Sequence, residues 1–262
     1  MKDYRFFVRD NRRIAEDTWQ MQLICWDATF FEEVRPGQFL HISLPNATHL
    51  LLRRPISIHS VEKDAHMVTL VYAIRGEGTR AMALLEKGTE VSVLGPAGNG
   101  FPIGEHSGEI WLLGGGIGVA PLLTVVQAAG ERPVRAYLGW RSAPQVYGVE
   151  SFERAGCEVK CFTDDGTFGE KGFAANALLE DLREHRPAAV FACGPMPMFR
   201  ALAPNMPEDV PCYLSLEERM GCGVGACLVC SCKIKARNEK GWTYKRVCVD
   251  GPVFPLEEVL FE

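Results

Sequence analysis

Residues 109–127 of the chain read EIWLLGGGIGVAPLLTVVQ. The apolar run Glu109–Leu113 passes directly into a glycine-rich turn and then into a helical stretch at Ala120–Gln127. Such a run is typical of a strand buried on both faces of a parallel sheet. A glycine turn at this junction lets a diphosphate approach the backbone and the N–H groups at the helix start. The stretch predicts an α/β domain that binds a dinucleotide, although a purely steric strand-to-helix turn gives the same pattern. The candidate contacts are Gly114, Gly115, Gly116 and Gly118.

Strand and helix patterns keep alternating after this stretch. Leu178, Leu179 and Leu182 have helical spacing and predict a helix over 174–185. Further strands are predicted at 134–140, 158–163 and 188–193. This alternation indicates a parallel α/β sheet. The last strand ends at the carboxyl edge of the sheet, where ligands of open α/β sheets collect, and a buried structural cysteine before a turn is the alternative. The candidate residues there are Cys193, Gly194 and Pro195.

The N-terminal part of the chain has short strand patterns between turns. Strands are predicted at 18–23, 39–44, 67–73 and 90–94, and the last is expected to end before Gly95-Pro96. Several short strands at this pitch favour an antiparallel barrel. The predicted domains are therefore 1–103, 104–210 and a cysteine-dense 211–262.

Two segments of the predicted barrel are candidate anion sites. Arg54 has a fork of donors that suits a diphosphate, and Ser57 offers a hydroxyl group. Gly76–Met82 predicts a helix start with small residues and a hydroxyl cap, which also suits an anion. The first signal is weak alone, because a solvated arginine pair at Arg53 and Arg54 is the commoner explanation.

Four cysteines near the C-terminus have the spacing of metal ligands. Cys222, Cys227 and Cys230 follow C-x4-C-x2-C, and Cys248 comes after a gap of 17 residues. This is the plant-type run for a [2Fe–2S] cluster with a shortened final gap. Zinc and a disulfide framework are the alternatives, although zinc sites prefer paired short spacings. Cys232 is interpreted as a strand residue that points away from Cys230 or packs nearby.

The composition limits the class of protein. The chain has 262 residues, of which 47% are hydrophobic and 23% charged, so a packed core is expected. The net charge of -5 and the lack of a basic stripe argue against a nucleic-acid partner. No apolar run reaches membrane-spanning length, and no apolar signal region follows the N-terminus, so a cytoplasmic protein without a membrane partner is expected. The ten cysteines are therefore expected to be reduced thiols with metal or redox roles.

The motifs resemble a known superfamily when they are taken in order. Arg54-Pro55-Ile56-Ser57 is followed by Gly78-Thr79, the glycine turn and Cys193-Gly194-Pro195. This order is similar to the ferredoxin–NADP reductase superfamily, in which an antiparallel Greek-key flavin barrel precedes a parallel α/β nicotinamide-binding domain. The small C-terminal [2Fe–2S] module and the ending Val247–Phe254 narrow the resemblance to the electron-transfer subunits of B-type, NAD-dependent dihydroorotate dehydrogenases. The resemblance covers essentially the full length of the chain. It implies a multidomain fold that combines β and α/β domains.

The resemblance also implies the cofactors and the residues that contact them. The cofactors are FAD and a [2Fe–2S] cluster, with NAD as co-substrate. Ala73 stands where relatives are expected to carry a basic side chain, which argues against a side-chain contact there. The implied FAD contacts are Arg54, Pro55, Ile56 and Ser57, the second flavin strand Val71, Tyr72 and Ala73, and the diphosphate pair Gly78 and Thr79. The implied cluster ligands are Cys222, Cys227, Cys230 and Cys248.

The function implied by the resemblance is electron transfer in pyrimidine biosynthesis. Dihydroorotate would reduce FMN in a separate catalytic subunit, and electrons would pass through the cluster and FAD to NAD. Such hydride transfer needs no side-chain acid or base, so no catalytic residue is predicted, and the six histidines are interpreted as structural or exposed. The implied assembly is a heterotetramer with two copies of each chain. Its interface candidates are the cluster region and Leu50–Leu52, although the latter is more often a buried strand.

Alternative functions also fit parts of this sequence. Small subunits of bifurcating transhydrogenases and sulfide dehydrogenases resemble the chain over its length, but one cluster ligand is expected to be aspartate in those. A reductase of an oxygenase system would need a longer ferredoxin domain. A zinc-stabilised binding module would leave the flavin motifs unexplained. Arg141 and Ser142, which follow the strand that ends in Gly139-Trp140, could hold a 2′-phosphate, whereas the resemblance implies NAD.

Overall fold

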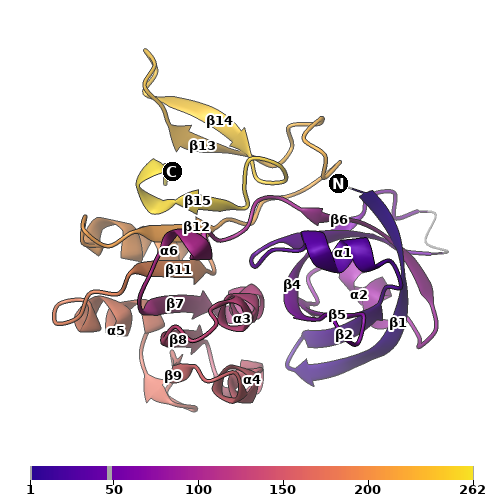
Figure 1. Cartoon of the computed structure of the whole chain (residues 1–262), viewed down its shortest axis with the longest axis horizontal. Coiled ribbons are helices and arrows are strands. Elements are labelled where there is room, and N and C mark those ends of the chain that lie inside the picture. Colours follow the sequence, from indigo (N-terminus) through magenta and orange to yellow (C-terminus); the bar gives the residue numbers. More distant parts are fainter. Residues whose placement is uncertain (1, 46–48, 262) are drawn as a thin grey trace.

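The computed structural model describes residues 2–45 and 49–261, which form a barrel, an α/β domain and a small C-terminal module (Figure 1). Antiparallel strands close the barrel in the order β1-β2-β5-β4-β3-β6, which confirms the predicted barrel. Two short helices belong to this part, α1 Ala28–Glu33 and α2 Glu77–Ala83. The strands are β1 Lys2–Ala15, β2 Thr18–Ile24, β3 Phe39–Ser43, β4 Arg54–Glu62, β5 Met67–Ala73 and β6 Glu90–Ala97.

Strand β3 has two different faces because side chains alternate along a strand. Leu40 and Ile42 point into the barrel core and are fully buried. Phe39 belongs instead to a neighbouring core that includes residues of the C-terminal module, so Phe39 and His41 face outwards. Strand β6 runs on to Ala97, which pairs with Phe39, so the predicted end of this strand before Gly95-Pro96 is wrong. The pairing of β3 with β6 has a register shift between Phe39 and His41, and an irregularity of this kind tolerates a proline within a strand.

The second part is a seven-stranded sheet in the order β10-β9-β8-β7-β11-β12-β15. All its pairings are parallel except that of β12 with β15, so the predicted parallel α/β sheet is confirmed. The strands are β7 Ile110–Gly115, β8 Val134–Trp140, β9 Glu158–Thr163, β10 Glu170–Lys171, β11 Ala189–Cys193, β12 Cys212–Ser215 and β15 Val253–Pro255. The helices are α3 Val119–Ala128, α4 Val149–Arg154, α5 Ala174–Asp181 and α6 Met196–Leu202.

Helix α3 joins the sheet to the barrel (Figure 1). The ring of His59 on β4 lies with Nδ1 2.8 Å from the carbonyl oxygen of Ala120 on α3. The backbone N–H of Gly37 donates to the hydroxyl oxygen of Thr124 over 3.2 Å. The two domains therefore share buried polar contacts and do not meet only through apolar packing.

The C-terminal module is built onto both other parts. Its hairpin, β13 Ser231–Lys235 and β14 Trp242–Arg246, projects from the body of the molecule in Figure 1. Strands β12 and β15 come from the same C-terminal region but pair within the large sheet. Cys230 and Cys248 share one buried core with Phe39 of the barrel and with Phe254. No helix within the described ranges is long and apolar enough to cross a membrane.

Candidate functional site

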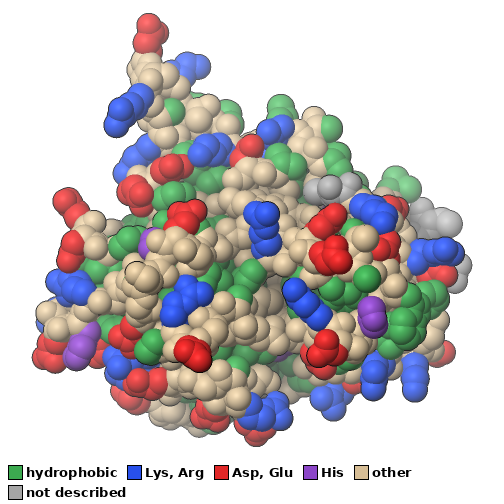
Figure 2. Space-filling view, in the orientation of Figure 1, with side chains coloured by type: hydrophobic (Ala, Val, Ile, Leu, Met, Phe, Trp, Pro, Cys, Tyr) green, Lys and Arg blue, Asp and Glu red, His purple; other side chains and the backbone are tan. Residues whose placement is uncertain are grey.

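A cavity of about 560 Å³ lies between the barrel and the carboxyl edge of the sheet. The glycine turn forms one wall, and Gly194 and Pro195 form another. Thr18 and Ala73 of the barrel close the opposite side. Acidic and basic side chains are interspersed over the face of the molecule in Figure 2, without a continuous basic patch. The cavity therefore brings the predicted nicotinamide-site glycines, Gly194, Pro195 and Ala73 into one place.

The glycine turn is shaped by close contact with the strand beside it. Strand β7 ends at Gly115, a 3-10 turn covers Gly116–Gly118, and helix α3 starts at Val119. Gly116 has φ +55°, a conformation that favours glycine. A Cβ atom at Gly118 would overlap the carbonyl group of Cys193, because β11 and β7 are neighbours. The predicted Gly114–Gly118 turn and Cys193-Gly194-Pro195 are thus packed backbone to backbone.

Tyr147 fixes this turn from behind. Its side chain is buried, and its hydroxyl group lies 3.2 Å from the carbonyl oxygen of Gly116 and 3.1 Å from that of Ile117. Burial raises the pKa of the Tyr147 phenol, so the group stays a hydrogen-bond donor. No sequence pattern predicts this contact, because a lone tyrosine in a loop belongs to no motif.

Two further residues of the cavity were also missed by the sequence prediction. Glu217 follows strand β12 and lines the cavity, where it remains accessible to solvent. The surrounding protein raises the pKa of the Glu217 carboxyl group, and the charge of Arg75 works in the opposite direction. Arg75 lines the same cavity. The thiol of Cys193 is buried behind the turn, and this burial raises its pKa, so it is a neutral packing group.

The segment with a possible 2′-phosphate contact lies at the same cavity. Gly139, Trp140 and Arg141 line it, together with Asp164 from the end of β9. The indole nitrogen of Trp140 is buried and has no hydrogen-bond partner among the described residues. Arg141 and Asp164 therefore place opposite charges at this end of the cavity.

Arg54 and Gly78, both predicted flavin contacts, touch each other. A Cβ atom at Gly78 would overlap the guanidinium group of Arg54, so only glycine leaves room for this contact. Thr79 caps α2, and its hydroxyl oxygen accepts from the N–H of Arg75 at 2.9 Å and of Gly76 at 3.2 Å. A guanidinium group held over the first turn of a helix fits the diphosphate of FAD.

The second predicted flavin strand presents its residues to different surroundings. Val71 packs in the core shared with the α/β domain, and Ala73 lines the cavity. The side chain of Tyr72 points into the barrel core, where its hydroxyl donates to Asn11 over 3.0 Å. On β4, Ile56 is buried in the barrel core, while Pro55 and Ser57 lie half-buried on the other face.

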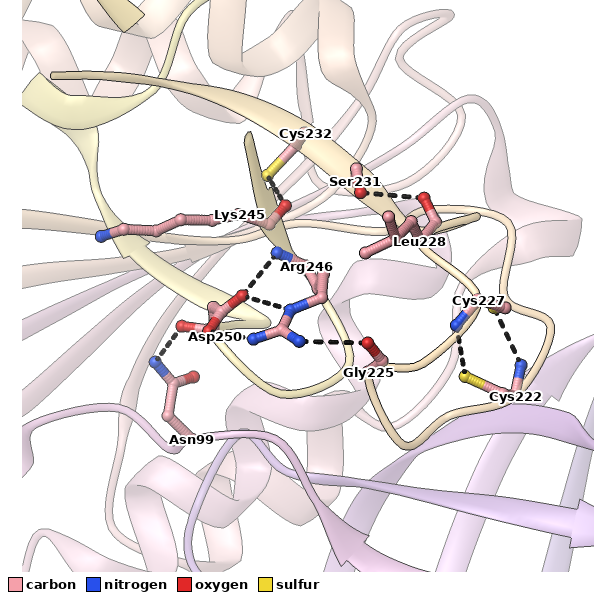
Figure 3. Close-up of polar contacts among 10 residues, drawn as sticks. All are labelled: Asn99, Cys222, Gly225, Cys227, Leu228, Ser231, Cys232, Lys245, Arg246 and Asp250. Atoms are coloured by element: carbon pink, nitrogen blue, oxygen red, sulfur yellow. Dashed lines mark hydrogen bonds and ion pairs between the residues drawn. The ribbon is translucent and has the colours of Figure 1, made fainter. Parts of the chain in front are cut away.

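The predicted cluster ligands lie in residues 221–230, here called the cluster loop, and at Cys248. Figure 3 shows Cys222 and Cys227 facing each other. The backbone N–H of each donates to the sulfur of the other over 3.4 Å, and the N–H of Val224 donates to Cys222 over the same distance. The N–H groups of Val224 and then of Cys227 lower the pKa of the Cys222 thiol to about 6. Gly223 with φ +72° and Gly225 with φ +80° allow the chain to turn in this way.

Cys230 and Cys248 form a second, buried pair beside the first. Burial, and then the neighbouring Cys230, raise the pKa of the Cys248 thiol to about 12. Within the described residues, no three His, Cys, Asp or Glu side chains gather as closely as a bound metal ion requires. The structure thus shows two sulfur pairs, and all four thiols are free. Sulfur-only donors with backbone N–H groups aimed at sulfur fit an iron–sulfur cluster.

Cys232 lies outside these pairs. It is part of β13, and its thiol donates to the carbonyl oxygen of Lys245 over 3.5 Å. Burial raises the pKa of this thiol to about 11. The prediction of a packed strand residue is confirmed.

An arginine–aspartate pair holds the cluster loop in place (Figure 3). Arg246 donates from Nη1 to the carbonyl oxygen of Gly225 over 3.0 Å. Its Nε and Nη2 donate to the carboxylate of Asp250 over 2.8 and 3.1 Å. Asn99 of the barrel side donates to the carbonyl oxygen of Asp250 over 3.3 Å. The pair lowers the pKa of Asp250 and links the loop to the rest of the molecule.

The predicted buried strand at Leu50–Leu52 is wrong. These residues lie outside every helix and strand, and Leu51 and Leu52 are 89% and 57% exposed. Leu residues favour burial on average, but among residues 2–45 and 49–261 no helix or strand covers Leu51. The other prediction for Leu50–Leu52, that these residues contact a partner subunit, stays a prediction.

Comparisons with known proteins agree with this geometry. Residues 217–260 match the family model for the iron–sulfur cluster binding domain of dihydroorotate dehydrogenase B, and residues 112–203 match an oxidoreductase NAD-binding domain. The first match favours the cluster over the zinc alternative.

Similar curated proteins share the name dihydroorotate dehydrogenase B (NAD(+)), electron transfer subunit. The one from Caldanaerobacter subterraneus subsp. tengcongensis is 40% identical over 97% of both chains. The one from Bacillus velezensis is 41% identical over 99% of both chains.

Solved structures show the same architecture. An NADH-dependent reduced ferredoxin–NADP oxidoreductase that carries out flavin-based electron bifurcation is similar with a TM-score of 0.83 and 27% identity, over 98% of this chain and 90% of that one. Phthalate dioxygenase reductase shares the fold with a TM-score of 0.65 and 18% identity, over 89% of this chain and 87% of that one. The identities of the curated relatives over nearly the full length decide the family. The chain belongs to the electron transfer subunits of dihydroorotate dehydrogenase B (NAD(+)).

Proposed function

We propose that this chain carries electrons between NAD and the FMN of a dihydroorotate dehydrogenase catalytic subunit, through its own FAD and [2Fe–2S] cluster, in pyrimidine biosynthesis. The proposed assembly has two copies of each chain and is cytoplasmic. FAD accepts or releases two electrons together or one at a time, whereas the cluster carries only one, so the pair converts hydride chemistry into single-electron transfer.

The barrel lies between the two sites, and this arrangement carries the proposal. Thr18 and Ala73 of the barrel form a wall of the nicotinamide cavity. On the outer face of β3, the ring of His41 lies against Gly223 of the cluster loop. A flavin held by the barrel through Arg54 and Gly78 would therefore have the nicotinamide on one side and the cluster on the other.

The residues of the chain bind and orient the cofactors. The turn at Gly114–Gly118 would receive the nicotinamide dinucleotide, since its backbone is open to the cavity. The guanidinium group of Arg54 and the first turn of α2 would receive the diphosphate of FAD. Cys222, Cys227, Cys230 and Cys248 would hold the cluster. Hydride transfer needs no side-chain acid or base, so Glu217 is proposed to shape the pocket.

A second candidate is the small subunit of a bifurcating transhydrogenase. The similarity to the electron-bifurcating oxidoreductase favours it, at 27% identity. The relatives of about 40% identity and the four available cysteines favour the dihydroorotate enzyme. The two candidates differ in the catalytic partner and in the nucleotide used.

Isolation of the complex from its native host tests the proposal. The tagged chain should retain FAD, iron and sulfide, and mass spectrometry should find an FMN-containing dihydroorotate dehydrogenase chain in the eluate. The eluate should reduce NAD with dihydroorotate and use NADH in preference to NADPH. A transhydrogenase large subunit in the eluate, or a chain that contains zinc without iron, contradicts the proposal.

A further inference from the structure

One buried histidine of the barrel touches the cluster loop and has no role in the proposed function. The side chain of His41 is 1% exposed. It lies on the outer face of β3, on the same side as Phe39, which packs with the C-terminal module. A Cβ atom at Gly223 would overlap the Nδ1 atom of His41. The ring is therefore pressed against the loop backbone, next to Cys222 in the chain.

Both nitrogen atoms of the His41 ring lack a hydrogen-bond partner within residues 2–45 and 49–261. A buried polar group without a hydrogen-bond partner destabilises the fold, so such a ring points to a partner that binds there. His59 provides a comparison, because it is equally buried and its Nδ1 lies 2.8 Å from the carbonyl oxygen of Ala120. Burial alone does not leave a histidine of this barrel without partners.

The protein around the His41 ring favours its neutral form. Burial, and then the positive charge of Arg53, lower its pKa to about 4. A neutral imidazole has one N–H donor and one acceptor nitrogen. His41 can thus donate a hydrogen bond to the loop side without bringing a charge.

We propose that His41 is a positioning residue for electron transfer, and that its ring N–H donates a hydrogen bond to a sulfur atom of the cluster held by the cluster loop. This inference rests on the proposed function, because it requires the cluster. A hydrogen bond to sulfur favours the reduced cluster, which carries one more negative charge, so it raises the reduction potential. His41 pairs across the sheet with Pro55 of the flavin motif. His41 therefore sets the driving force for electron transfer between FAD and the cluster.

The experiment uses the full-length chain with both cofactors, labelled with ¹⁵N-histidine. Electron–nuclear double resonance of the reduced cluster should detect coupling to a histidine ¹⁵N and to an exchangeable proton. His41→Leu should remove both couplings and make the cluster potential more negative, while the iron content, the FAD content and the FAD potential stay at wild-type values. A tenfold change in the electron equilibrium between FAD and the cluster appears as a shift of 59 mV for this one-electron couple.

His41→Gln keeps a donor and should restore the exchangeable-proton coupling and most of the potential without the ¹⁵N signal. His185→Leu, an exposed histidine of the α/β domain, should change neither readout. A wild-type cluster without histidine coupling overturns the inference, even if His41→Leu does not fold. A shift of the FAD potential alone also overturns it and assigns the ring to the flavin. A wild-type chain that binds no cluster overturns the proposed function and this inference together.

Discussion

The two glycine-rich loops of this chain are built by opposite means. The turn at Gly114–Gly118 lies between a buried strand and a buried helix, and Trp111, Leu113 and Val119 around it are fully buried. The cluster loop exposes its apolar side chains, with Val224 at 50%, Leu228 at 62% and Val229 at 57%. The hydrogen bond from Arg246 to the carbonyl oxygen of Gly225 helps to hold this loop in place.

We expect the turn at Gly114–Gly118 to be a preformed site and the cluster loop to be a site that its cofactor completes. The packed core determines the shape of the first loop before any nucleotide binds. The second loop has few apolar contacts, so we expect its order to depend on metal binding, which couples to folding through deprotonated thiols. A substitution that disturbs one of these two loops should therefore leave the other intact.

The largest effect is expected when a ligand of the cluster loop is lost. Cys227→Ser should lose most of the iron and the visible absorbance of the cluster, because sulfur is replaced at an exposed position with few other restraints. Iron analysis and the absorbance spectrum measure this loss. FAD content and NADH-dependent ferricyanide reduction should remain, since the glycine turn lies elsewhere.

Cys232→Ser is the matched control, because its thiol bonds to Lys245 on the neighbouring strand. It should keep the cluster. A Cys227→Ser chain with full iron content, or a Cys232→Ser chain without iron, would show that the ligand set is wrong.

Gly118→Val should damage the preformed loop and leave the cluster intact. The added side chain overlaps the carbonyl group of Cys193, so the free energy of unfolding should fall by about 1–3 kcal/mol. Misplacement of the turn should lower kcat/KM for NADH by roughly a hundredfold. Steady-state kinetics and thermal unfolding measure the two effects. Gly104→Ala is the control, since nothing lies within 4 Å of its added atom; equal losses in both variants would refute a local effect.

Arg246→Leu should loosen the cluster loop without unfolding the chain. The ion pair with Asp250 is partly exposed, at 37% and 33%, so solvent screening keeps its contribution to the free energy of unfolding small. The lost donor to Gly225 should shorten the time for which the cluster survives in a chelator by several-fold. Arg237→Leu changes an exposed arginine of the same hairpin region and should leave this time unchanged. Equal cluster lifetimes in Arg246→Leu and the wild type would show that the pair does not hold the loop.

Tyr147→Phe should weaken the preformed loop only slightly. It removes the hydroxyl group beside the carbonyl oxygens of Gly116 and Ile117, and a hydrogen bond of this kind contributes about 0.5–1.5 kcal/mol. KM for NADH should rise while the cluster spectrum is unchanged. A normal KM together with wild-type stability would mean that packing alone holds the turn.

The smallest effect is a pH dependence at the support of the glycine turn. Burial lowers the pKa of His59, which holds α3 through Ala120. The unfolded chain therefore binds a proton near pH 6.5, while the folded chain does not until lower pH, so the free energy of unfolding should fall as the pH drops below about 6.5. Denaturant unfolding from pH 7.5 to 5.5 measures this slope. His59→Gln should make this slope shallower, with a remainder from His41, whose pKa is also lowered, and an equal slope in this variant would place the titration elsewhere.

The order of the domains, the glycine turn and the cysteine spacing can all be recognised in the amino-acid sequence. They can be recognised because a buried strand, a turn and a run of ligands are each formed by residues that are close together in the sequence. Strand boundaries were also predictable where β-branched and aromatic residues cluster, as at Met67–Ala73 and Val134–Trp140. The exposure of Leu51 and the continuation of β6 past Pro96 were not, since both depend on what packs beside them.

The residues that complete each site from a distance are brought there by folding. Tyr147 reaches the glycine turn, Arg246 reaches Gly225, and His41 reaches Gly223, across long separations in the chain. None of these residues belongs to a motif, because its role depends on a partner brought close by folding. The residues that bind the cofactors therefore lie in sequence motifs. The residues that hold those motifs in place are brought to them by contacts that form only when the chain folds.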